Sequence, residues 1–171
     1  MYAETIPALS KMLSNLERWL DDAVEVAEAR GFDPDVLLAC RLAPDMFTLT
    51  RQIQAACDSA KFIAARLGGV DAPSDPDSET TLAEVRARIA RTREFVASVP
   101  EAGFVESGSR ELVLPFLQGG SVTGSDYTRE FAMPNFYFHL SMAYAILRHN
   151  GVPLGKRAFI GSMTVKPPPA E

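Results

Sequence analysis

Residues 133–151, MPNFYFHLSMAYAILRHNG, hold both histidines of the chain, His139 and His149, in an aromatic-rich segment with helical spacing. Asn135 precedes His139 by four residues, so the two side chains are expected about one turn apart on one face of a helix. The ten residues from His139 to His149 correspond to about 15 Å of helix. A site that uses an imidazole is therefore expected around Asn135 and His139, with His149 too distant to share it.

The composition of the chain is typical of one ordinary globular domain. Of 171 residues, 47% are hydrophobic and 23% charged, and the formal net charge is -5. Because phosphate binding needs clustered cations, this acidic balance argues against a surface built for nucleic acid. We expect no membrane contact, since no segment approaches the roughly 18 apolar residues of a spanning helix and no signal sequence is evident. The two cysteines, Cys40 and Cys57, form no CxxC pair, which favours a cytoplasmic protein.

Apolar residues recur at helical spacing through most of the chain. The pattern predicts helices at residues 9–31, 34–43, 44–69, 81–100 and 126–149. Gly31 suits the C-cap of the first helix, because glycine adopts the left-handed conformation needed there. Thr81 and Glu84 have the spacing of a capping box, so the helix over residues 81–100 is expected to begin at that point.

A change of pattern between residues 100 and 126 predicts a small β-hairpin. Residues 111–117 and 121–123 form two short runs on either side of a Gln-Gly-Gly turn. The predicted fold class is therefore all-α, an antiparallel four-helix bundle with a small β-hairpin insertion before the last long helix. Residues 1–161 are expected to form this single domain, and residues 162–171 a flexible tail.

Four strings of the sequence carry a resemblance to a known family, and they are residues 41–47 (RLAPDMF), 52–58 (QIQAACD), 134–139 (PNFYFH) and 143–152 (AYAILRHNGV). From about residue 2 to residue 161, the chain resembles a bacterial family catalogued only as a domain of unknown function, numbered nineteen ninety-three. That family is similar to the DinB/YfiT-like helical bundles, a superfamily of predicted metalloenzymes that includes thiol-dependent transferases and isomerases. The resemblance implies a divalent metal, such as zinc or nickel, and an activity with a low-molecular-weight thiol.

The resemblance also implies a set of metal ligands. In those bundles the metal is held by one histidine of the second long helix and an HxxxH pair of the last one. His139 falls on the second histidine of that pair and Asn135 on the first, while Gln52, or Gln54 on a more exposed face, replaces the third. Because zinc and nickel favour imidazole and thiolate ligands over amide oxygens, Gln52, Asn135 and His139 would form a degenerate metal site or none.

Two other interpretations of these helices stay open at the level of the sequence. A carboxylate from Asp45 or Asp58 would strengthen the metal site if it turned inward. Cys57 and His139 would form a nucleophile and base if the helices over residues 44–69 and 126–149 face each other. Cys57 equally suits a buried position in an alanine-rich stripe.

The sequence therefore predicts a polar pocket, lined by Gln52, Asn135, His139 and Tyr144, that binds an unknown small molecule. The alternative is a divalent-metal-dependent transferase or isomerase that uses a low-molecular-weight thiol. Consecutive aromatic residues of the last long helix point to different sides, so some must lie outside the bundle seam. An exposed apolar patch is typical of an interface, and the sequence also predicts a homodimer formed through this helix around Phe138.

Overall fold

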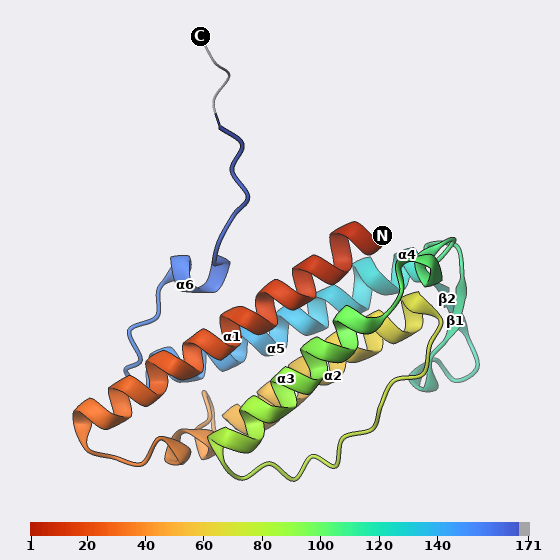
Figure 1. Cartoon of the computed structure of the whole chain (residues 1–171). Helices are drawn as coiled ribbons and strands as arrows, with labels where there is room; N and C mark the ends of the chain where they lie inside the picture. Colours follow the sequence, from red (N-terminus) through yellow and green to blue (C-terminus); the bar gives the residue numbers. More distant parts are fainter. Residues whose placement is uncertain (168–171) are drawn as a thin grey trace.

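The computed structural model of the chain describes residues 1–167, and four long helices dominate it (Figure 1). These are α1 (Tyr2–Arg30), α2 (Leu49–Gly68), α3 (Leu82–Ser98) and α5 (Met133–His149). The shorter helical segments are η1 (Pro34–Ala39), η2 (Glu101–Phe104), η3 (Pro115–Leu117), α4 (Gly124–Asp126), η4 (Tyr127–Ala132) and α6 (Lys156–Ile160). Strands β1 (Glu111–Val113) and β2 (Ser121–Thr123) pair antiparallel, with Leu112 opposite Val122. The predicted helical fold with a small hairpin before the last long helix is confirmed.

The four long helices do not simply alternate in direction. α2 runs antiparallel to α5, since Gln52 contacts His139 and Ser59, further along α2, contacts Asn135. α3 runs parallel to α2, because residues 69–81 cross the length of the molecule before α3 begins (Figure 1). α1 runs parallel to α5 and antiparallel to α3 (Figure 1). The antiparallel arrangement expected from the sequence therefore describes the pairs α2–α5 and α1–α3. The neighbouring pairs α2–α3 and α1–α5 are parallel.

Two of the helix ends follow from the capping residues named above. Gly31 has φ 72° and closes α1, with its N–H donated to backbone carbonyls of the last turn. Thr81 accepts a hydrogen bond from the N–H of Glu84, whose carboxylate in turn accepts one from the N–H of Thr81. Both predicted caps are confirmed, because each satisfies backbone groups that a helix end leaves without partners.

The predicted start of the second long helix at Pro44 is wrong. α2 begins at Leu49, where the side chain of Thr48 accepts a hydrogen bond from the N–H of Arg51. Residues 41–48 form turns instead. Thr48 is the stronger start signal, because its hydroxyl accepts a hydrogen bond from a free N–H of the first turn. Proline is compatible with the first turn of a helix but supplies no such partner.

The entry to α5 departs from a regular α-helix. Residues 127–132 form the π-helix η4, continuous with α4 before it and α5 after it. Pro134 has no N–H to offer the carbonyl of Glu130, and its ring would clash with that carbonyl in an α-helix. A local change to i→i+5 hydrogen bonding accommodates this defect.

The core lies between the long helices and extends under α6. Trp19 is buried, and its indole N–H donates to the carbonyl of Ala158 at 3.0 Å while its ring stacks on Phe159 at 5.4 Å. These contacts attach α6 to α1. None of the helices within residues 1–167 is long and apolar enough to cross a membrane. Residues 162–167 are exposed and without regular structure, and residues 168–171 of the predicted tail lie outside the described part of the chain.

An ion cluster ties the long connection before α3 to the helices beneath it. Its members are Asp58 and Lys61 of α2, Arg88 of α3, and Asp75, Asp77 and Glu79 of the connection. Arg88 is 1% exposed and lies 2.9 Å from Asp58 and 2.6 Å from Asp77. Arg88 of α3 therefore lies inside the cluster rather than on a solvated face, and it holds Asp77 and Glu79 while Lys61 holds Asp75.

Candidate functional site

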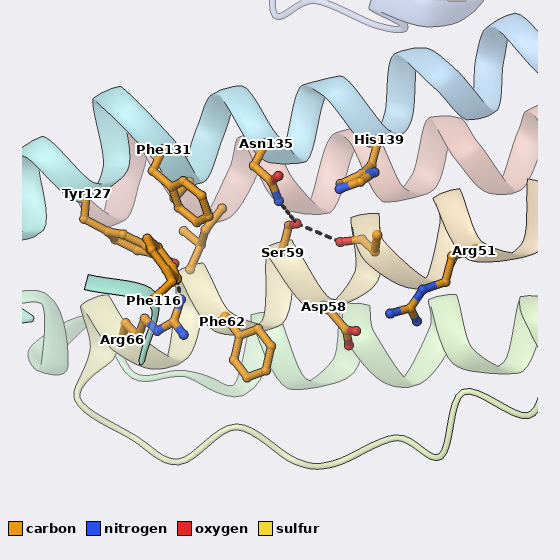
Figure 2. A pocket seen from close by; sticks show the side chains of 13 residues that line it. Arg51, Asp58, Ser59, Phe62, Arg66, Phe116, Tyr127, Phe131, Asn135 and His139 are labelled. Carbon is orange, nitrogen blue, oxygen red and sulfur yellow. Dashed lines mark hydrogen bonds between the residues drawn. The ribbon is translucent and has the colours of Figure 1, made fainter. Parts of the chain in front are cut away.

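A cavity of about 250 Å³ lies between α2 and α5 (Figure 2). Its polar lining consists of Arg51, Asp58, Ser59, Arg66, Asn135 and His139, and its aromatic lining of Phe62, Phe116, Tyr127 and Phe131. Cavities for drug-sized ligands are typically about 300–1,000 Å³. This cavity would therefore hold only a small molecule. Because its lining is part polar and part aromatic, it suits a molecule that has both polar and apolar groups.

The two helices place these side chains in matched layers. Three hydrogen bonds of 2.8 Å join α2 to the α5 side, and they pair Gln52 with His139, Ser59 with Asn135, and Arg66 with Tyr127. The three α2 residues are seven apart, which is close to two full turns, so they share one face. The cavity therefore follows the seam between the helices, with His139 towards one end and Arg66 towards the other (Figure 2).

His139 is held as a neutral imidazole with one free nitrogen. Its Nδ1 lies 2.8 Å from Oε1 of the buried Gln52, and an amide oxygen can only accept, so Nδ1 carries the proton. Nε2 is then left with a lone pair. Burial, and next the positive charge of Arg51, lower the pKa of His139 below its ordinary value. The free nitrogen is therefore a hydrogen-bond acceptor or a base at neutral pH.

Asn135 is also fixed in orientation. Its Nδ2 donates to Oγ of Ser59, and that hydroxyl donates to the carbonyl of Ala55 at 2.7 Å (Figure 2). The amide nitrogen thus faces α2. Its Oδ1 has no hydrogen-bond partner within residues 1–167, which leaves a second acceptor in the cavity lining, one helical turn before His139.

The structure brings together three of the four predicted pocket residues. Asn135 and His139 line the cavity, and Gln52 lies behind His139 and positions its ring. Tyr144 does not join them. Its ring packs at 5.5 Å from Trp19 and 5.6 Å from Phe159, on the side of α5 that faces α1 and α6.

The structure does not bring Cys57 to His139, and it favours the other interpretation that the sequence left open, a buried packing cysteine. Cys57 is fully buried and hydrogen-bonded to Thr92 of α3, on a face of α2 turned away from α5. Burial raises the pKa of its thiol to about 12. A thiol of this kind is neither near a base nor ionised at neutral pH, so Cys57 is a packing residue.

The described residues do not fit the three-ligand metal site that the family resemblance implies. Within residues 1–167, no three His, Cys, Asp or Glu side chains gather closely enough to hold an ion. The carboxylate of Asp58 is occupied by Arg88, Asp45 is exposed, and Gln54 turns to Glu79 at 2.8 Å. One imidazole nitrogen and the oxygen of Asn135 remain, whereas zinc sites use at least three protein ligands of stronger type.

Sequence reasoning missed Ser59, Arg66 and Tyr127 as site residues. A signal for the first two was present, because polar residues at 52, 59 and 66 recur every seventh position and so mark a polar line on the helix. Phe116 gave no such signal, since it lies in η3 and reaches the cavity only through the folding of the hairpin.

The chain is similar to known sequences and structures over nearly its whole length. The family described as "Domain of unknown function (DUF1993)" matches residues 1–160. The crystal structure of a DinB family member protein from Shewanella denitrificans is 47% identical to the chain, with a TM-score of 0.94, and the match covers 98% of this chain and 95% of that one. No curated protein matches.

Proposed function

The chain belongs to the DUF1993 family, and we propose that it is a DinB-like protein that binds a small molecule in the cavity between α2 and α5. In this proposal α1, α2, α3 and α5 act as a four-helix bundle whose seam carries the site. The observation that supports it best is the pair of unused acceptors at the cavity wall, Nε2 of His139 and Oδ1 of Asn135, which belong to residues one turn apart on α5.

Two acceptors in this position favour a ligand with an acidic or weakly acidic proton. A hydroxyl, thiol or amide N–H would donate to Nε2 of His139, with Oδ1 of Asn135 as a second acceptor. The apolar part of the ligand would lie against Phe62 and Phe131. Because the imidazole is neutral at pH 7, it would also be able to take the donated proton, which is the first step of a general-base reaction.

The alternative is a divalent-metal-dependent transferase or isomerase that uses a low-molecular-weight thiol. The similarity to a DinB family member protein supports this alternative, but one imidazole and one amide oxygen are a poor ligand set for zinc or nickel. We therefore derive no step through a metal. Metal analysis of protein purified without a histidine tag tests this point, and stoichiometric metal that is lost in His139→Ala would favour the alternative.

The binding proposal is tested with a set of neutral aromatic alcohols, starting from 4-ethylphenol, by ligand-observed NMR and calorimetry. We expect His139→Ala to weaken binding by about fivefold to tenfold, since one hydrogen bond is lost. His149→Ala is the matched control, because this exposed histidine at the end of α5 lies outside the cavity. Equal affinity for the wild type and His139→Ala would overturn the proposal.

A further inference from the structure

The end of the cavity opposite His139 is formed by a cation that has no acidic partner. Arg66 lines the cavity, and none of the carboxylates within residues 1–167 pairs with it. Its one side-chain hydrogen bond there is from Nη1 to the hydroxyl of Tyr127. The other cation of the lining, Arg51, is by contrast paired with Asp77. Arg66 thus keeps its positive charge, and most of its five N–H donors, for something else.

Aromatic rings hold this guanidinium in place. Its carbon lies 4.9 Å from the ring centre of Phe62 and 5.3 Å from that of Tyr127, both within the range of cation–π contacts. Tyr127 is itself buried, and its ring lies 6.1 Å from that of Phe131. A guanidinium fixed between rings keeps its edge available and loses little freedom when it binds a planar group.

The acidic residue at the cavity wall does not cancel the charge of Arg66. Asp58 is held 2.9 Å from Arg88 and 3.1 Å from Lys61, so its own charge is compensated inside the ion cluster. The cavity thus has one uncompensated cation at the Arg66 end and a pair of acceptors at the His139 end.

We propose that the ligand carries a carboxylate that binds Arg66, an apolar or aromatic body, and a proton donor that binds His139. This inference rests on the proposed function and names the class of its ligand. One guanidinium matches the single charge and the planar, two-oxygen shape of a carboxylate. Arg66 and His139 line the same cavity from opposite ends, so a ligand that binds both lies lengthwise along the seam between α2 and α5 (Figure 2).

The test compares two probes that differ only in charge, 3-(4-hydroxyphenyl)propanoate and 3-(4-hydroxyphenyl)propanamide. We expect the wild-type protein to bind the carboxylate at least about tenfold more tightly than the amide, since a charge-assisted contact is added. Arg66→Gln should abolish that preference, and Arg66→Lys should keep part of it. The matched control is Arg129→Gln, because Arg129 is exposed on η4 and paired with Asp126 and Glu130. Circular dichroism shows whether each variant is folded.

The outcomes separate the two proposals. Binding of both probes with equal affinity, unchanged in Arg66→Gln, overturns the carboxylate subsite and leaves the binding cavity standing. A preference for the carboxylate that Arg129→Gln removes as fully as Arg66→Gln also overturns the subsite, because it would reflect net charge alone. If neither probe, nor any neutral alcohol, binds the wild-type protein, the proposed function itself fails.

Discussion

His139 is the residue whose chemistry depends most on its neighbours. Gln52 fixes which ring nitrogen carries the proton, and burial together with Arg51 disfavours the charged form. The sequence indicated that any chemistry that uses an imidazole takes place within residues 133–151, because both histidines of the chain lie there. It did not show the tautomer or the shifted pKa, since both depend on residues that lie 87 and 88 positions away and approach only in the folded state.

We expect His139 to titrate below its ordinary pKa of 6.5 in the native protein, and His149 to give the second imidazole signal. Proton NMR of the two rings measures this, with His149→Ala assigning the signals. Arg51→Gln should raise the pKa of His139, whereas Arg66→Gln, which removes a charge at the opposite end of the cavity, should change that pKa less. A His139 that titrates above 6.5 in the wild type would contradict the arrangement.

The same shift sets a pH dependence of stability. Above pH 6.5 both the folded and the unfolded chain carry a neutral His139, so the residue makes no contribution. As the pH falls below that value, the unfolded chain binds the proton first. The free energy of unfolding therefore decreases until His139 is protonated in the folded state as well.

The two cysteines should differ sharply in reactivity. Cys57 is fully buried with a thiol pKa of about 12, whereas Cys40 is half-buried at the end of η1. We expect a thiol reagent at pH 8 to modify one cysteine in the native protein and two after denaturation, because the thiolate is the reactive form. Cys40→Ser should leave the native protein nearly unreactive. Rapid native labelling of that variant would mean that Cys57 is accessible.

At the scale of the elements, the site depends on the register between α2 and the α4–η4–α5 segment. Tyr127, Phe131, Asn135 and His139 follow one another every fourth residue, and in a regular α-helix four residues overshoot a full turn by about 40°. The wider π turn before Pro134 offsets part of that drift and keeps Tyr127 on the cavity side. The sequence predicted the helix over residues 126–149, but periodicity assumes regular turns and could not place Tyr127.

The ion cluster gives a prediction at the same scale. Removing Arg88 leaves Glu79 without a cationic partner and Asp58 with Lys61 alone, and breaking a buried pair from one side costs roughly 3–5 kcal/mol. We expect Arg88→Met to lower the free energy of unfolding by about 3 kcal/mol, measured by urea denaturation. Arg86→Met is the control, because the exposed pair of Arg86 with Asp21 is worth about 0–1 kcal/mol. Equal losses in the two variants would contradict the structural role of the cluster.

At the scale of the whole molecule, the helix directions were the part of the fold that the sequence did not supply. Residues 70–79 form a polar, proline-bearing stretch of the sequence, and a loop of that composition is compatible with either direction for the next helix. The structure extends it along the molecule because Lys61 and Arg88 bind its carboxylates. Burial alone would raise the pKa of Asp75, but the hydrogen bond and charge of Lys61 outweigh it and lower that pKa. Pairings between distant positions, rather than local propensity, set this connectivity.

The surface of the molecule also bears on its assembly. Large aromatic side chains remain exposed at the cavity, and these are Phe62, Phe116 and Phe131, while Phe138 is exposed further along α5. Phe131 and Phe138 are seven residues apart and are 40% and 51% exposed. Apolar surface of this kind is typical of an interface, and a self-complementary patch on one helix suits a two-fold dimer. A homodimer formed through α5 therefore stays a prediction, and the surface around Phe131 and Phe138 is where the contact between the two copies is expected.

We expect sedimentation velocity at micromolar concentration to give a dimer and Phe138→Ser to shift it towards the monomer. A stable interface buries about 800 Å² on each partner, so removing one of the most exposed rings from its centre should weaken association measurably. Val105→Ser is the matched control, because Val105 is also an exposed apolar residue but lies outside α5, directly after η2. A monomer in the wild type that Phe138→Ser leaves unchanged would mean that the exposed aromatic residues at the cavity serve the ligand rather than a second copy of the chain.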